Sequence, residues 1–127
     1  MNAISMATGA VQHIVLPVGD LGRAADFYCR LLGFQPVTDY DTFMLLTNGH
    51  VTLTLRPRAD GESPWGYTQF GLSLPGRTEL EAAARLLADC GVPHQAIHHF
   101  ADIGILVLSL RDPDDNRVDL IVPADKG

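Results

Sequence analysis

The alternation of hydrophobic and polar positions predicts strands and helices in the same order twice. In the first half, a strand over 11–18 precedes a helix over 21–32, and strands follow over 34–38, 42–47 and 50–56. In the second half, a strand over 68–74 precedes a helix over 79–90, and strands follow over 94–100, 103–110 and 117–122. Strand apolar residues recur with period two and helix apolar residues at helical spacing. Each half therefore reads β-α-β-β-β, which favours one duplicated module over two unrelated pieces.

Capping and turn residues agree with these boundaries. Asp20 is a predicted N-cap, and Thr78 is a predicted N-cap that forms a capping box with Glu81. Gly33 and Gly91 are placed where helices end in left-handed backbone. Asn48-Gly49 between two apolar runs is typical of a tight hairpin.

The predicted strands have one apolar face and one mixed face. The apolar face can pack under the helices, and a mixed face on a curved sheet would line a cleft, which is the usual form of a small-molecule site. An antiparallel sheet can also have one face in plain contact with water, and that alternative stays open for the threonines and the serine. The mixed face carries His13, Thr52, Thr54, Arg56, Gln69, Ser73 and Asp119.

Asp119 and His13 stand out on that face. Asp119 lies inside the apolar run 118–122, where an unpaired carboxylate would be costly to bury. His13 lies in the apolar first strand. Each residue is locally unfavourable, which indicates a role.

Length and charge limit the classes of function. A chain of 127 residues predicts one domain over 11–123, made of modules 11–57 and 68–123 with a linker 58–67 and a flexible N-terminus 1–10. The net charge of −6 argues against nucleic acid and an anionic membrane surface as partners. The first ten residues lack a basic start and a long apolar core, so we expect a cytoplasmic protein.

Two segments resemble a known superfamily. "HIVLPVGDLGRAADFYCRLLGF" resembles the opening, and "LRDPDDNRVDLIVP" the close, of vicinal oxygen chelate proteins, which include glyoxalase I, extradiol dioxygenases, and fosfomycin and bleomycin resistance proteins. The resemblance extends over about 11–123. It implies an α+β fold of two β-α-β-β-β modules with mixed sheets curved around a cleft, and a homodimer.

The same resemblance implies a set of metal ligands. His13, Gln69 and Asp119 fall at positions where the superfamily holds a divalent ion such as Zn, Ni, Mn or Fe. Gln69 stands where a histidine is common, and Asp119 stands in place of a glutamate. The closing position of the first module falls near Thr52 or Thr54, and neither is a normal divalent ligand.

Three functions remain open from the sequence. The first is a metal-dependent lyase or isomerase that uses His13, Gln69 and Asp119. The second is a metal-free small-molecule or antibiotic-binding protein of the bleomycin-resistance type, in which Trp65 and Tyr67 stack on an aromatic ligand. The third is a dioxygenase, which needs a further histidine for a two-histidine, one-carboxylate iron site. Further candidate ligand contacts and histidines are Thr52, Thr54, Arg56, Ser73, His98 and His99.

Overall fold

The computed structural model describes residues 5–40, 42–63 and 68–124. Internal contacts divide the chain after Arg58 into two compact units, which we call the N-terminal module (1–58) and the C-terminal module (59–127). Residues 5–12 contain no helix or strand. No helix of the described ranges is both long and apolar enough to cross a membrane.

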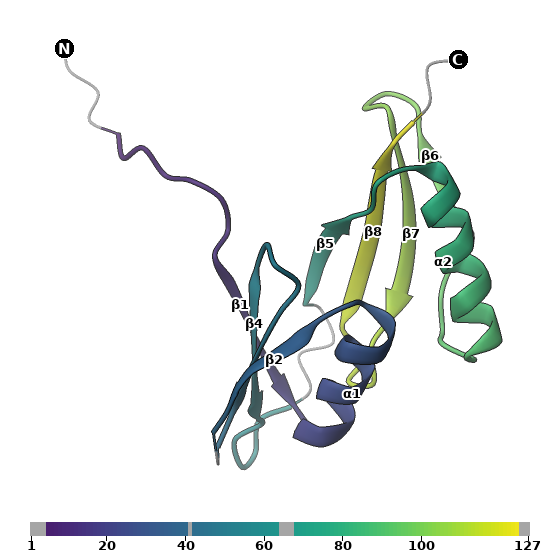
Figure 1. Cartoon of the computed structure of the whole chain (residues 1–127). Coiled ribbons are helices and arrows are strands. Elements are labelled where there is room, and N and C mark those ends of the chain that lie inside the picture. Colours follow the sequence, from purple (N-terminus) through teal and green to yellow (C-terminus); the bar gives the residue numbers. More distant parts are fainter. Residues whose placement is uncertain (1–4, 41, 64–67, 125–127) are drawn as a thin grey trace. The chain divides into compact units, whose positions relative to one another are not determined.

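The N-terminal module is a four-stranded mixed sheet covered by one helix (Figure 1). Its elements are β1 (His13–Val18), α1 (Leu21–Leu31), β2 (Gln35–Asp39), β3 (Met44–Thr47) and β4 (Thr52–Pro57). The strand order is β1-β4-β3-β2, in which β1 and β4 are parallel and the other pairs are antiparallel. The helix contacts β2, β3 and β4.

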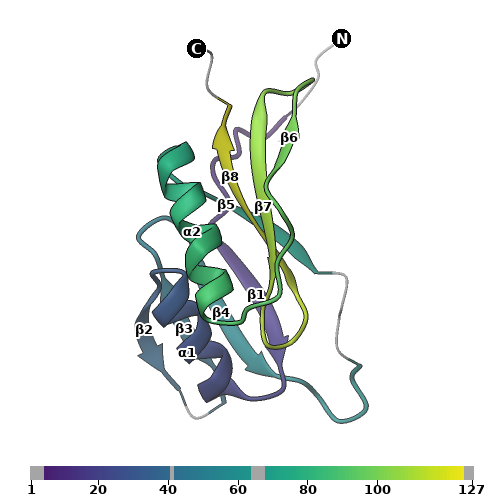
Figure 2. The same cartoon turned by 90° about the vertical axis from the view of Figure 1, so that its right-hand side faces the viewer.

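The C-terminal module repeats this plan. Its elements are β5 (Gln69–Ser73), α2 (Arg77–Asp89), β6 (His98–Phe100), β7 (Ile105–Arg111) and β8 (Arg117–Pro123). The order β5-β8-β7-β6 again combines one parallel pair with two antiparallel pairs. Figure 2 shows α2 lying along one face of this sheet, where it contacts β7 and β8. The predicted pair of β-α-β-β-β modules is confirmed.

The apolar strand faces form the core of each module. Period-two alternation gives β1, β3, β4, β7 and β8 an apolar side with almost completely buried side chains. The N-terminal core includes Leu16, Tyr28, Leu46, Leu53 and Leu55. The C-terminal core includes Leu80, Leu108, Leu110, Val118 and Val122.

One predicted N-cap is confirmed and one is wrong. The Asp20 carboxylate accepts from the Arg23 backbone N–H at 3.0 Å and caps α1. The second helix begins at Arg77, with Gly76 as its N-cap and no side-chain cap. The Gly76 carbonyl already accepts from the Leu80 N–H at 3.1 Å, so Thr78 lies inside the first turn and cannot cap it.

The strand predicted over 94–100 is interrupted. Its regular part is β6, and His94 forms an isolated bridge to Leu110. His98 is four positions after His94, whereas their partners Val107 and Leu110 are three positions apart. One extra residue therefore lies on this edge segment, which is the definition of a β-bulge.

Candidate functional site

Four polar side chains meet on the face of the C-terminal sheet opposite α2. Gln69 is on β5, Ser109 on β7, and Arg117 and Asp119 on β8. Ser109 pairs with Asp119 across the antiparallel ladder, and Gln69 pairs with Arg117 across the parallel one. Arg117 and Asp119 are two residues apart, so they share a strand face. We call this group the Asp119 cluster.

Three donors occupy the Asp119 carboxylate. Its Oδ1 accepts from Ser109 Oγ at 2.7 Å and from Arg117 Nε at 2.9 Å. Its Oδ2 accepts from Gln69 Nε2 at 3.0 Å. Asp119 is only 8% exposed, but its charge is both paired and hydrogen-bonded. These contacts explain how a carboxylate is accommodated within an apolar strand.

The same contacts keep Asp119 ionised. Burial alone would raise the pKa of the carboxyl group. The hydrogen bonds from Arg117 and Ser109, the charge of Arg117 and the hydrogen bond from Gln69 outweigh burial, so the pKa lies below its usual value. The cluster at neutral pH therefore contains a carboxylate and a guanidinium ion in direct contact.

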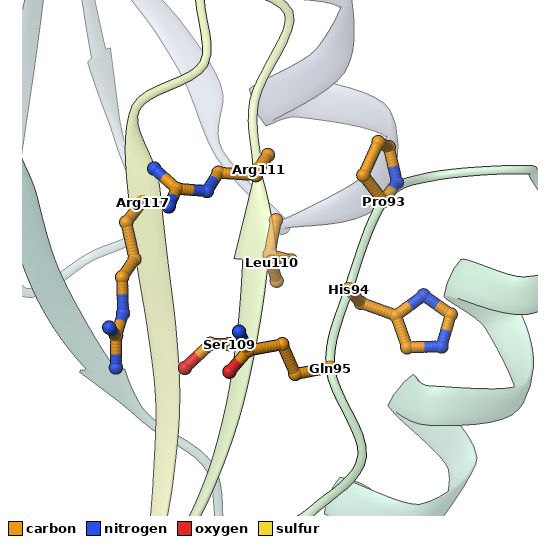
Figure 3. A pocket seen from close by; sticks show the side chains of 7 residues that line it. All are labelled: Pro93, His94, Gln95, Ser109, Leu110, Arg111 and Arg117. Atoms are coloured by element: carbon orange, nitrogen blue, oxygen red, sulfur yellow. The ribbon is translucent and has the colours of Figure 1, made fainter. Parts of the chain in front are cut away.

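Two adjoining pockets lie beside the cluster, and they share Gln95, Ser109 and Arg117. Figure 3 shows the smaller of the two. The larger has a volume of about 270 Å³ and is also lined by Ala96, His98, Phe100 and Val107. The smaller has a volume of about 190 Å³ and is also lined by Pro93, His94, Leu110 and Arg111. In Figure 3 the Arg117 side chain runs along β8 toward the level of Ser109 and Gln95.

The β-bulge helps to build the larger pocket. In a regular strand, residues three apart such as Gln95 and His98 point to opposite faces. The extra residue between them changes this alternation, and both side chains line the same pocket. The Gln95 N–H still donates to the Ser109 carbonyl at 2.9 Å, so this edge segment stays attached to β7.

The N-terminal sheet has its own mixed face. His13 and Val15 on β1 lie opposite Thr52 and Thr54 on β4. His13 is exposed, and both threonines are partly buried. Further along β4, Arg56 Nη1 donates to the Pro57 carbonyl at 3.1 Å.

Among the predicted site residues, the structure brings Gln69 and Asp119 together. His98 lines the larger pocket, whereas His99 pairs with Leu106 on the other face of the sheet. Ser73 lies further along β5, opposite Ile121. The remaining predictions divide into His13, Thr52, Thr54 and Arg56 on the N-terminal module, and Trp65 and Tyr67 outside the described residues.

Sequence reasoning missed Ser109, Arg117, Gln95 and Phe100. Two of them left a signal. Ser109 is the one polar residue in the run "ILVLSL", and Arg117 precedes Asp119 by two positions, which places both on one strand face. Gln95 and Phe100 left none, because their placement depends on the bulge and on the pairing of β6 with β7.

The Asp119 cluster is a poor match for a divalent ion. The described ranges hold no group of three or more His, Cys, Asp or Glu side chains that could bind one. Within the cluster, the guanidinium of Arg117 already neutralises Asp119, and Gln69 turns its N–H toward the carboxylate. A dication placed here would have to compete with the Arg117 guanidinium for the Asp119 carboxylate.

Comparison with known proteins places the chain in a family. The profile of the Glyoxalase/Bleomycin resistance protein/Dioxygenase superfamily matches residues 10–120. The chain belongs to this superfamily, which confirms the resemblance seen in the sequence.

One relative is a dioxygenase that is more than twice as long as the matched part of this chain. The chain is 29% identical over 117 residues to a catechol-2,3-dioxygenase of Bacillus subtilis, with 87% of this chain and 40% of that protein covered. The chain thus spans less than half the length of this curated relative.

Two solved structures show the fold. A lactoylglutathione lyase from Agrobacterium tumefaciens has a TM-score of 0.77 at 21% identity, covering 91% of this chain and 95% of that chain. TnmS3, an antibiotic binding protein from Streptomyces sp. CB03234, has a TM-score of 0.77 at 23% identity, covering 94% and 100%.

Proposed function

We propose that the chain is a small-molecule-binding protein that works without a divalent ion, with its site in the two pockets of the C-terminal module. The Asp119 cluster is the observation that carries this proposal. The position that the superfamily resemblance assigns to a metal-binding carboxylate is here engaged by an arginine. The same arginine lines both pockets, so a fixed cation is offered to a ligand.

The physical argument rests on preorganisation. The Arg117 side chain is about one third exposed, and its Nε is held by Asp119 at 2.9 Å. A side chain already held in one orientation loses less conformational entropy when a ligand binds. The superfamily match and the antibiotic-binding structural neighbour support a binding role.

A second candidate is a metal-dependent lyase or isomerase that uses His13, Gln69 and Asp119. The convergence of Gln69 and Asp119, whose Nε2 and Oδ2 atoms are 3.0 Å apart, favours it. Under this hypothesis, a metal would have to displace the Arg117 guanidinium from the carboxylate. The dioxygenase hypothesis needs a second histidine ligand, and the described residues hold no group of three or more His, Cys, Asp or Glu side chains that could bind an ion.

Elemental analysis of protein purified without chelator separates the two candidates. We expect less than stoichiometric Zn, Ni, Mn and Fe, and a change in Tm below about 1 °C when one equivalent of any of them is added. One equivalent of metal that survives dialysis and is lost in both His13→Ala and Asp119→Asn would overturn the metal-free proposal.

A variant of Arg117 tests whether this arginine is what opposes the binding of a divalent ion. Arg117→Leu removes the cation while leaving Asp119 in place, so its affinity for divalent ions should rise above that of the wild type. Arg85→Leu, at an exposed position on α2, is the control and should leave metal affinity unchanged. Equal metal affinities of the Arg117 variant and the wild type would show that the arginine does not oppose a metal.

The assembly and compartment remain proposals. We propose a homodimer, because closed two-fold dimers are the commonest oligomers, and a cytoplasmic location. Sedimentation at micromolar concentration measures the assembly directly, and the mass of a single chain would contradict the dimer.

A further inference from the structure

The charged group of the larger pocket has a defined orientation. Asp119 Oδ1 accepts the Nε–H of Arg117, so contact with the carboxylate restrains the orientation of the guanidinium. The two terminal nitrogens remain, and no partner for them occurs among the described residues. Two parallel N–H groups at the end of a guanidinium match the two oxygens of a carboxylate.

The charges around the pockets favour an anion. The described lining residues include no acidic residue; Arg117 lines both pockets, and Arg111, which pairs with Asp115 at 3.9 Å, lines the smaller one. Asp119 is buried beside Arg117 and is already neutralised by it. In Figure 3 the Arg111 side chain points across toward β8, whereas that of Arg117 runs along the strand, so the two cations do not crowd one point.

The lining of the larger pocket also includes two aromatic side chains. His98 and Phe100 lie two residues apart on β6 and both line it. Their ring centroids are 4.3 Å apart and the rings are inclined at 69°. Phe100 is 37% exposed, and Val107 and Ala96 add apolar surface. An aromatic ring can pack edge-to-face or stacked against such a pair.

The size limits the ligand. The volume of about 270 Å³ lies below the range of roughly 300–1,000 Å³ typical of sites for drug-sized molecules. A ligand with one or two rings is therefore the appropriate scale. Gln95, brought into this pocket by the bulge, adds an amide that can donate to or accept from a ring substituent.

We propose that this pocket binds an aryl carboxylate, with the carboxylate on the terminal nitrogens of Arg117 and the ring against His98 and Phe100. This inference rests on the proposed function and specifies its ligand class. Asp119 is then a positioning residue, because it holds the guanidinium in line with the ligand and does not contact it.

A probe series tests both halves of the ligand. The probe is 2-naphthoate, followed by calorimetry in the presence of EDTA and by backbone NMR. 2-Naphthamide keeps the rings and removes the charge, and cyclohexanecarboxylate keeps the charge and removes the aromatic ring. We expect one-to-one binding of 2-naphthoate, with the largest NMR shifts at Gln95, His98 and Ser109, and at least tenfold weaker binding of both analogues.

Variants test the two contacts separately. Arg117→Gln should weaken 2-naphthoate at least tenfold, and Arg117→Lys, which keeps the charge but loses the planar fork, should restore only part of the affinity. Phe100→Leu should weaken it by about fivefold, which is the size expected from an aromatic pair. Arg85→Gln on the exposed surface of α2 is the control and should bind as the wild type does.

Asp119→Asn gives a readout that a purely structural role would not produce. If Asp119 positions Arg117, this variant should lose preference for 2-naphthoate over 2-naphthamide while remaining folded. If it discriminates between the two ligands as the wild type does, the positioning role is wrong.

The outcomes separate this inference from the proposed function. If 2-naphthamide, or a cationic naphthylmethylamine probe, binds as well as 2-naphthoate and shifts the same residues, the ligand class is wrong and the binding site stands. If no probe shifts these residues, or binding requires an added divalent ion, the proposed function fails together with the ligand class.

Discussion

The two modules share a backbone plan but not a polar face. Through the strand pairing, His13, Thr52 and Thr54 of the N-terminal sheet correspond to Gln69, Arg117 and Asp119 of the C-terminal sheet. Leu45 corresponds likewise to Ser109, since each pairs with the closing residue of its sheet. One copy carries a histidine, two threonine hydroxyls and a leucine, and the other carries a four-membered charged network.

This difference shows which residues maintain the fold and which are available for chemistry. The helix-side faces are leucine- and valine-rich in both copies and almost fully buried. The opposite faces have diverged without any change in strand order. The apolar face therefore specifies the module, and the mixed face can acquire a site in one copy alone.

Truncating the shared core should have the largest effect and should affect both copies alike. Leu46 and Leu110 hold equivalent positions and are 0% and 1% exposed. Each change to alanine should lower the free energy of unfolding by about 2–5 kcal/mol, because buried leucines lose transfer free energy and leave a cavity. Urea denaturation measures both variants. A loss of stability in only one of the two variants would show that the two cores are not equivalent.

Truncating Asp119 should lower the free energy of unfolding more than truncating Thr54, the corresponding residue of the N-terminal module. Asp119→Ala leaves Ser109, Gln69 and Arg117 without their acceptor and should cost about 2–3 kcal/mol. Thr54→Ala, at the corresponding position, should cost less than about 1 kcal/mol. The same denaturation experiment tests the pair, and equal losses would contradict the asymmetry of the two faces.

Lowering the pH should remove the contribution of Asp119 to the free energy of unfolding. The folded-state pKa is lowered, so this stabilisation is complete above the ordinary carboxyl pKa of about 3.9 and is lost as pH falls through the folded-state pKa. The stability difference between wild type and Asp119→Asn should therefore be flat above about pH 5 and shrink below about pH 4. Urea titrations from neutral pH to pH 2 measure it. A difference that is constant over this range would exclude the linkage.

A substitution in a hairpin turn should cause the smallest change in the free energy of unfolding. Gly49 in the β3–β4 turn has φ +93°, whereas the β7–β8 turn places Asp115 at φ +65°. Asp115→Gly would give the second turn a residue that adopts left-handed backbone without a Cβ penalty. The loss of an exposed 3.9 Å ion pair with Arg111 offsets little. We expect a gain of about 0.5 kcal/mol, seen as a rise in Tm, and a fall in Tm would contradict it.

The repeat could be predicted from sequence because its signals are local. Period-two faces, helical spacing and the glycines that end both helices each extend over a few residues. The superfamily resemblance added the positions of Gln69 and Asp119. That Gln69 and Ser109 donate hydrogen bonds to Asp119 could not be predicted, because these contacts depend on the register of strands whose residues lie 50 and 10 positions away. The bulge between Gln95 and His98 carries no glycine or proline to mark it.

The spacing of the three donors to Asp119 has a consequence for the order of folding. Arg117 and Ser109 are 2 and 10 residues from Asp119, within one hairpin, whereas Gln69 is 50 residues away on the parallel strand. Closing the shorter loop loses less chain entropy, and hairpins form within microseconds. The guanidinium–carboxylate contact can therefore form while β5 is still detached, and the φ-value of Gln69→Ala should be lower than that of Ser109→Ala. The last contact to form in the cluster is then the one that joins the first strand of the module to its last.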